Sequence, residues 1–226
     1  TKMVYDIMGR LRFSRTAEMG NSITYYKYDR WGRAIEKGIF SGTWNQTTLQ
    51  QHAADPSYPN TGTTVQSKYY YDGSEGTHIY LAPYRGQLTR TESYESNTLA
   101  NSVTFTYDLN GNLIQTAQLI SGTVSPGTYT TQYQYDVSGN IKLIQYPVWN
   151  NSPFKVSYTY DYVGNMSNIG DQTTANAYAS YEWNPDGSLY HEKLMQTNRY
   201  VLPVWHWYNA PGWKNYSGYG DTLRLP

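Results

Sequence analysis

Cysteine is absent from this chain of 226 residues, and charged residues are scarce. Without cysteine the chain has no disulfides, no thiolate metal site and no cysteine nucleophile. Lysine plus arginine and aspartate plus glutamate number 17 each, so no net charge attracts nucleic acid or an anionic membrane. Charged residues make up 15% of the chain, below the usual quarter, and Thr, Ser, Asn and Gln fill the polar positions instead. This composition suits a β-sheet surface outside the cytosol.

Long apolar runs are also absent. No run approaches ~18 apolar residues, so no membrane span is expected in this segment. The first residues, Thr1 to Val4, lack the pattern of a signal peptide. Disorder is not expected either, because aromatic residues form 16% of the chain and tyrosine alone contributes 26.

What the chain does have is one short pattern that recurs from end to end. An aromatic residue and an acid are followed by two variable positions, a glycine, a polar residue and usually an aliphatic one. The clearest copies begin at Tyr107, Tyr135 and Tyr160, and earlier copies begin at Tyr5 and Tyr28. Aromatic and polar residues alternate before each copy, which indicates a strand with one buried face. The acid can accept backbone N–H groups, and the glycine can adopt a positive φ, so each copy predicts a β-hairpin turn.

Three further copies depart from this pattern. After Tyr71 and Asp72 the glycine comes late, at Gly86, which predicts an enlarged turn over Gly73–Arg85. After Tyr181 the glycine is again delayed, to Gly187. An eighth, degenerate copy runs from Tyr208 to Gly212; it keeps the glycine four residues on but has Asn209 in place of the acid. The predicted structural turn residues are therefore Tyr5, Asp6, Gly9, Tyr28, Asp29, Gly32, Tyr71, Asp72, Gly86, Tyr107, Asp108, Gly111, Tyr135, Asp136, Gly139, Tyr160, Asp161, Gly164, Tyr181, Gly187, Tyr208 and Gly212.

The predicted fold is all-β. One hairpin cannot bury its own apolar face, so the hairpins must stack in tandem. Eight hairpins give about sixteen strands, which would extend roughly 75 Å at ~4.8 Å per strand and should curl. We expect one continuous sheet over residues 1–226, with residues 38–66 as an excursion. We interpret it as a surface loop, with a binding loop as the alternative, and Leu49–Ala54 could form about one helical turn. An array that begins in mid-repeat would expose an unpaired edge, so we expect a longer parent chain or another chain to cover it.

The repeat resembles that of the RHS, or YD-repeat, family. The resemblance rests on Tyr28-Asp29-x-x-Gly32-Arg33 and on the copies at Tyr107, Tyr135 and Tyr160, and it covers nearly the whole chain. It implies a β-sheet that spirals into a hollow shell, as in bacterial polymorphic toxins, the cocoon of Tc toxin complexes and the teneurin barrel. It also implies a secreted or cell-surface bacterial protein. Toxin-carrying members often cleave themselves at an Asp-Pro-x-Gly type of motif, which this segment lacks.

No pattern of catalytic or metal-binding residues emerges. The four histidines, at positions 52, 78, 191 and 206, lie far apart, and no serine elbow or phosphate-binding glycine loop occurs. The repeated acids favour turn capping over catalysis, since they recur in every copy. The stretch from Asp108 to Asn112 is similar to the start of a calcium loop but lacks the distal glutamate. We therefore expect no enzyme activity, no catalytic residues, no metal and no cofactor.

Aromatic residues cluster near the end of the chain. Trp205, Trp207, Trp213 and Tyr216 are the candidate binding residues, because rings of this kind stack on sugars, although core packing is the commoner role. Too few cations accompany them for single-stranded nucleic acid. Two functions remain: a structural shell segment that encloses or presents another polypeptide, or a surface module that binds a glycan or a partner protein. The expected partners are the rest of a longer chain or an associated protein.

Overall fold

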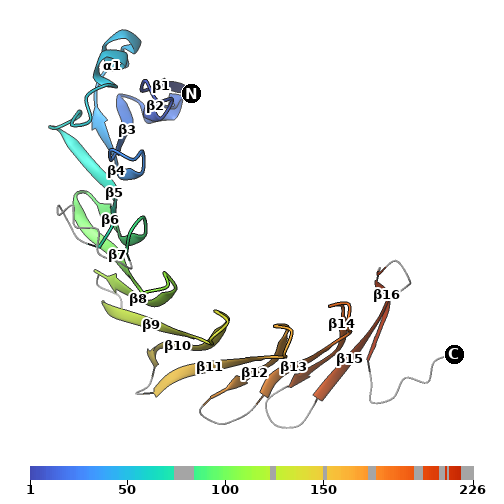
Figure 1. Ribbon diagram of the computed structural model, residues 1–226. Coiled ribbons are helices and arrows are strands. Elements are labelled where there is room, and N and C mark those ends of the chain that lie inside the picture. The colour runs from blue at the N-terminus through green and yellow to red at the C-terminus, as the bar shows by residue number, and fades with distance from the viewer. Residues whose placement is uncertain are drawn as a thin grey trace. The chain divides into compact units, whose positions relative to one another are not determined.

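The computed structural model describes residues 1–73, 84–122, 126–149, 152–172, 177–195, 201–208, 212 and 214–219. Sixteen strands follow one another in chain order in a single antiparallel sheet (Figure 1). The prediction of an all-β chain of tandem hairpins is confirmed. Among the described residues, no helix is long and apolar enough to cross a membrane.

The chain forms two units, residues 1–129 and 130–226. The first contains β1 (Lys2–Tyr5), β2 (Leu11–Arg15), β3 (Ser22–Tyr28), β4 (Ala34–Ser41), β5 (Thr63–Tyr71), β6 (Leu88–Glu95), β7 (Thr98–Tyr107) and β8 (Leu113–Ile120). It also holds a short 3-10 helix, η1 (Ala17–Met19), and one α-helix, α1 (Gln46–His52).

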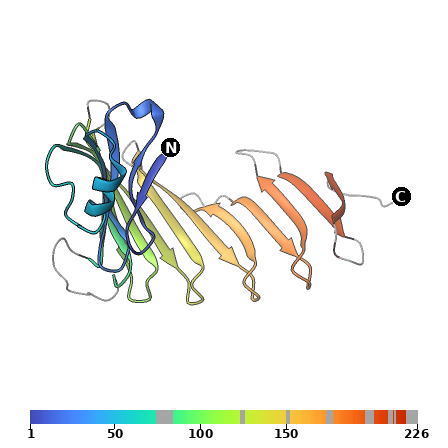
Figure 2. The same ribbon diagram turned by 90° about the horizontal axis from the view of Figure 1, so that it is seen from above.

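The division falls within β9 (Gly127–Tyr135), whose greater part belongs to the second unit. That unit continues with β10 (Ile141–Trp149), β11 (Ser152–Tyr160), β12 (Met166–Asp171), β13 (Ala177–Trp183), β14 (Leu189–Met195), β15 (Val201–Tyr208) and β16 (Lys214–Tyr219). Within it, the tight turns after β9, β11 and β13 lie side by side along one edge of the sheet (Figure 2).

The hairpins share one register at their tips. The repeat aromatic pairs with the residue six positions later, as in Tyr107 with Leu113 and Tyr160 with Met166. The residue after this partner has no residue opposite it, which is a β-bulge and increases the local twist. The same bulge recurs at Arg12, Ile35, Thr89, Ile114, Lys142, Ser167, Tyr190 and Asn215.

The main core lies in the first unit, where β1 to β4 curl around it (Figure 1). Its buried residues are Val4, Phe13, Ile23, Tyr25, Phe40, Leu49 and Ala53. Phe13 of β2 and Phe40 of β4 come from strands that are not neighbours, yet their ring centroids are only 6.2 Å apart. Tyr58 packs edge-on against both rings, with centroid distances of 5.9 Å.

The excursion predicted over residues 38–66 is shorter and more buried than expected. β4 continues to Ser41 and β5 begins at Thr63, so only residues 42–62 leave the sheet. These residues form α1, whose N-cap Asn45 accepts the Thr48 N–H at 3.1 Å, and place Leu49 in the core. The segment does leave the sheet and most of its residues are exposed, but it is not only surface, because Leu49 and Ala53 are buried in the main core.

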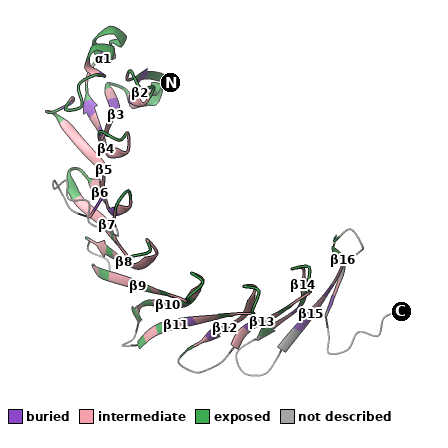
Figure 3. Cartoon of the chain, viewed as in Figure 1, coloured by how far each residue is buried: buried purple, intermediate pink, exposed green. Residues whose placement is uncertain are grey.

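Beyond this core most described strand residues are half-buried (Figure 3). All nine residues of β5, for example, have intermediate burial. The predicted separation into one apolar and one polar face is therefore weaker than the alternation in the sequence indicates. Stability along such a sheet depends on bonds between neighbouring hairpins more than on a deep core.

Candidate functional site

The repeated turn is the feature that sequence and structure both single out. In six copies, the first residue of the turn donates its N–H to the carbonyl four positions later, at 2.8–3.0 Å. The glycine donates its N–H back to the carbonyl of that first residue, at 2.9–3.1 Å. The six first residues are Asp6, Asp29, Asp108, Asp136, Asp161 and Asn184.

The carboxylate of each aspartate turn is fully engaged within its own loop. Asp136 Oδ1 accepts the N–H groups of Ser138 and Asn140, both at 2.9 Å, and its Oδ2 accepts the Asn140 Nδ2–H at 3.1 Å. The hydrogen bond from the Asn140 side chain, with those from the backbone, holds the pKa of Asp136 below its ordinary value. A carboxylate held ionised by its own turn is suited to fixing backbone, which agrees with the predicted capping role.

Glycine meets a backbone requirement in these turns. Gly139 has φ +85° and Gly164 has φ +100°, values that L-residues with a side chain rarely adopt. No atom lies within 4 Å of a Cβ built at either position, so conformation rather than crowding selects glycine.

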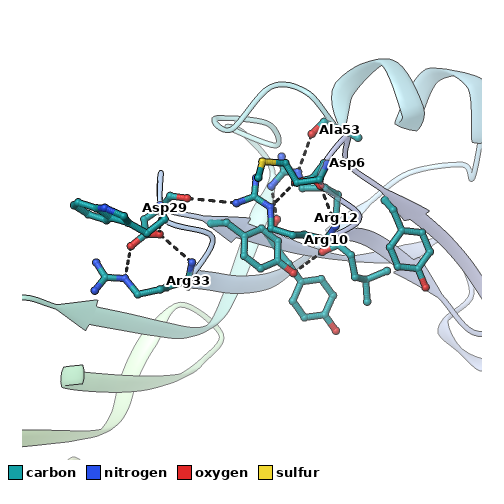
Figure 4. A network of polar contacts seen from close by, with 12 residues as sticks. Asp6, Arg10, Arg12, Asp29, Arg33 and Ala53 are labelled. Carbon is teal, nitrogen blue, oxygen red and sulfur yellow. Dashed lines mark hydrogen bonds and ion pairs between the residues drawn. The ribbon is translucent and has the colours of Figure 1, made fainter. Parts of the chain in front are cut away.

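In the first two repeats an arginine follows the glycine and connects one turn to the next (Figure 4). Arg10 donates to the Asp6 carboxylate at 2.7 Å and reaches the Asp29 carbonyl at 3.5 Å. Arg33 donates to the Asp29 carboxylate and to the Asp72 carboxylate, both at 2.6 Å. The bond from Arg33 holds the pKa of Asp72 below its ordinary value. The repeats that begin at Tyr107, Tyr135, Tyr160 and Trp183 carry Asn or Ser at this position, and these side chains bond the first part of their own turn.

The third turn keeps the pattern despite its insertion. Asp72 donates its N–H to the Gln87 carbonyl at 3.1 Å, and Asp72 Oδ1 accepts the Gly86 N–H at 2.7 Å. Tyr71 pairs with Leu88, as an aromatic and an aliphatic residue do in the other copies. Residues 74–83, most of the predicted enlarged turn, lie outside the described residues.

The predicted seventh turn at Tyr181 is wrong. Trp183 pairs with Leu189, and the turn runs from Asn184 to Ser188 with Gly187 at its ordinary place. Tyr181 lies two residues earlier in β13. The glycine is therefore not delayed: tryptophan takes the place of tyrosine, and asparagine the place of aspartate. A search for an aromatic followed by an acid could not find this copy, whereas the spacing of aromatic, glycine and aliphatic residues could have.

The eighth copy agrees with the degenerate repeat at Tyr208. Tyr208 pairs with Lys214 across the hairpin, with the register shift beside it, and Gly212 has φ +81°. Residues 209–211 lie outside the described residues, as does Trp213.

In four copies the repeat aromatic joins its own hairpin to the preceding one. Its hydroxyl or indole N–H donates a hydrogen bond to the carbonyl of the residue beside the previous bulge. The pairs are Tyr28 to Leu11 at 2.8 Å, Tyr107 to Leu88 at 2.8 Å, Tyr160 to Ile141 at 2.9 Å and Trp183 to Met166 at 2.6 Å. We call this contact the inter-hairpin bond. It provides a donor for a backbone carbonyl where the bulge disrupts the ladder of hydrogen bonds. This explains why the repeat has an aromatic residue with a donor group at this position.

Of the aromatic residues near the end of the chain, Trp205 packs within the sheet. Trp205 stacks on His191, with ring centroids 3.7 Å apart and an interplanar angle of 9°. One face of the Trp205 ring is therefore covered by a residue of the same sheet. Trp207 pairs with Tyr216 across β15 and β16, but the Tyr216 side chain lies outside what the structure describes.

A polar cluster around one buried carboxylate, Glu92, lies on β5 and β6 and was not predicted from the sequence. Glu92 is 8% exposed and accepts the hydroxyls of Tyr70 and Tyr94, both at 2.6 Å, while Arg90 lies 3.2 Å away. Burial raises the pKa of Glu92, but the hydrogen bonds and cations outweigh it and leave the pKa lowered. Only the alternation of the strands, which places these residues on one face, could have indicated this cluster. Among the described residues, no three His, Asp or Glu gather as metal ligands do.

No protein-family model matches the chain, and no curated protein matches it. Solved structures of Tc toxin chains do. The crystal structure of TcdB2-TccC3-TEV is 17% identical, with a TM-score of 0.47, over 95% of this chain and 11% of that chain. The Tc holotoxin pore of Photorhabdus luminescens is 14% identical, with a TM-score of 0.38, over 94% of this chain and 13% of that one. This chain thus spans only a small part of the length of the structures it resembles.

Proposed function

We propose that this chain is a structural wall segment of the RHS type, and that the wall encloses another polypeptide. The observation that carries the proposal is the inter-hairpin bond, because it is found in the copies at Tyr28, Tyr107, Tyr160 and Trp183 and joins each of these repeats to the preceding one. A wall must keep neighbouring hairpins together, and this bond joins one hairpin to the next.

Three sets of contacts hold successive hairpins together. The backbone ladder pairs each strand with its neighbour, as β10 does with β11. The inter-hairpin bond adds a side-chain contact at the turn edge, such as Tyr160 to Ile141. In the first repeats Arg33 adds an ionic contact between turns. The residues that define the repeat are therefore used to build the sheet.

The half-buried strands favour a single-layered sheet that can make contacts on both of its faces. In β9, Gln132 and Gln134 are exposed while Tyr133 and Tyr135 are half-buried. A single layer of this kind can face solvent on one side and an enclosed chain on the other. The partner we propose is a polypeptide, and the place of action is outside the cell.

Protease protection in the natural full-length protein tests the proposal. The enclosed polypeptide should resist digestion in the wild type. A Tyr107→Phe/Tyr160→Phe variant, which removes two inter-hairpin bonds, should let protease reach it sooner. Tyr162→Phe is the matched control, because the Tyr162 side chain is fully exposed in its turn. A polypeptide digested at once in the wild type, or at the same rate in all three proteins, would contradict enclosure by this wall.

A further inference from the structure

The helix α1 lies against β1, the first strand of the sheet. Gln50 donates its Nε2–H to the Tyr5 carbonyl at 2.9 Å, and Gln46 donates its Nε2–H to the Met3 carbonyl at 3.4 Å. β1 pairs with β2 on its other side, and the described residues give it no second strand. The two glutamines therefore bond the edge of β1 that has no strand beside it.

The spacing of the glutamines fits this edge. Gln46 and Gln50 are four residues apart, about 6 Å along a helix axis. Met3 and Tyr5 are two residues apart, about 6.8 Å along a strand, and alternate carbonyls point to the same edge. One helical turn thus spans two successive edge carbonyls of β1.

The helix is held firmly in this position. Leu49 and Ala53 are each 4% exposed and belong to the main core. Arg12, the bulge residue of β2, is 2% exposed and donates to the carbonyls of Ala53 at 3.2 Å, Asp55 at 2.6 Å and Tyr58 at 2.9 Å. One buried guanidinium thereby fixes the end of α1 and the loop after it to the sheet.

An exposed edge strand offers unpaired backbone groups to any other strand, and natural sheets block such edges with covering elements. We propose that α1 is an edge guard, which stops a second copy of this chain from adding to β1. Release of α1 would free the carbonyls of Met3 and Tyr5 for a β1-to-β1 pair.

The test uses the chain with Gln46→Ala/Gln50→Ala, and Gln51→Ala as matched control. Gln51 lies on the same helix, is exposed, and makes none of these bonds. Two readouts are needed. Hydrogen exchange at the Leu49 amide, which donates to Asn45, reports release of the helix. A Met3→Cys substitution in each protein reports pairing of two β1 edges, since the chain has no other cysteine.

The proposal predicts about tenfold faster exchange at Leu49 in the double variant, from the loss of the two bonds to β1 and of the bond that Trp44 Nε1–H donates to Gln46. It also predicts at least about fivefold more disulfide-linked dimer, with Gln51→Ala at the wild-type level. Faster exchange without more dimer would overturn the proposal, because release of α1 would then leave β1 closed. Unchanged exchange and unchanged dimer would also overturn it. If the double variant loses strand content by circular dichroism, Gln50→Ala alone replaces it.

Discussion

Trp183 donates its indole N–H to the carbonyl of Met166 at 2.6 Å, at the place where other repeats donate a tyrosine hydroxyl. Tyr160 makes the corresponding bond to Ile141 at 2.9 Å. Two different aromatic rings thus place a donor against the same backbone position. The requirement at this place in the repeat is a ring that carries a hydrogen-bond donor, rather than tyrosine itself.

Tyr160→Phe should lower the free energy of unfolding by about 1 kcal/mol. The substitution removes the hydroxyl and leaves the Ile141 carbonyl beside the bulge without this donor. Urea unfolding followed by circular dichroism measures the change. Tyr162→Phe, in a side chain that is fully exposed, should be within about 0.5 kcal/mol of the wild type. Equal losses in the two variants would show that the inter-hairpin bond contributes nothing.

Trp183→Phe should destabilise the chain by a similar amount, about 1 kcal/mol, because it removes the donor to Met166. Trp183→Tyr should recover part of that loss, since tyrosine makes this bond in three other repeats. Thermal unfolding of the three proteins gives the order. A tyrosine variant that is less stable than the phenylalanine variant would argue against a donor requirement.

Much of the fold follows from the sequence because the repeat fixes local geometry. The turns at Asp108, Asp136 and Asp161 lie at their predicted positions, since an acid and a glycine at this spacing close one type of loop. The same rule failed at Asn184, where the backbone geometry persists although tryptophan replaces the tyrosine and asparagine replaces the acid. The same turn geometry thus forms with residue types that the tyrosine-and-acid pattern excludes.

Contacts between residues far apart in the chain could not be predicted from the sequence. Nothing near Arg12 indicates that it would bond the carbonyl of Asp55, 43 residues later. The polar residues around Leu49 likewise indicated a surface loop, although Leu49 is 4% exposed in the core. These contacts arise from the curl of β1 to β4, which no local pattern specifies.

Gly139→Ala should lower the free energy of unfolding by about 1 kcal/mol. Space is available for the methyl group, so the cost comes from holding alanine at φ +85°. Gly122→Ala is the control, because it also has open space but no positive φ. The midpoints of denaturant unfolding of the two variants and the wild type measure the difference. A midpoint for Gly139→Ala as high as that for Gly122→Ala would contradict the conformational reason for glycine.

Acid should destabilise the sheet through its turn carboxylates. Hydrogen bonds from Asn112 and Asn140 hold the pKa values of Asp108 and Asp136 below the ordinary 3.8. The folded state therefore binds these protons less readily than the unfolded state does. Their contribution is present above the unfolded pKa and is lost as the pH falls through the folded pKa. Urea midpoints should be lower at pH 3 than at pH 7, with a smaller difference in Asp136→Asn. Equal midpoints at the two pH values would oppose this role.

Arg33→Lys should destabilise the chain by roughly 1–2 kcal/mol. Arg33 bonds Asp29 and Asp72 at once and lies over the Tyr71 ring at 4.3 Å, and a lysine ammonium cannot reproduce this planar arrangement. Urea unfolding at low and high salt measures the loss, which should shrink in high salt. Lys142→Arg, at a bulge in the second unit, serves as a control and should be near neutral. A fully stable Arg33→Lys would mean that the contact between turns is dispensable.

Native-state hydrogen exchange on Tyr160→Phe tests the central claim most directly. If the repeat aromatic joins two hairpins, exchange should accelerate both in its own hairpin, β11 and β12, and in the preceding one, β9 and β10, while Tyr162→Phe exchanges as the wild type does. Acceleration confined to β11 and β12 would contradict the account, because the aromatic residue would then stabilise only its own turn.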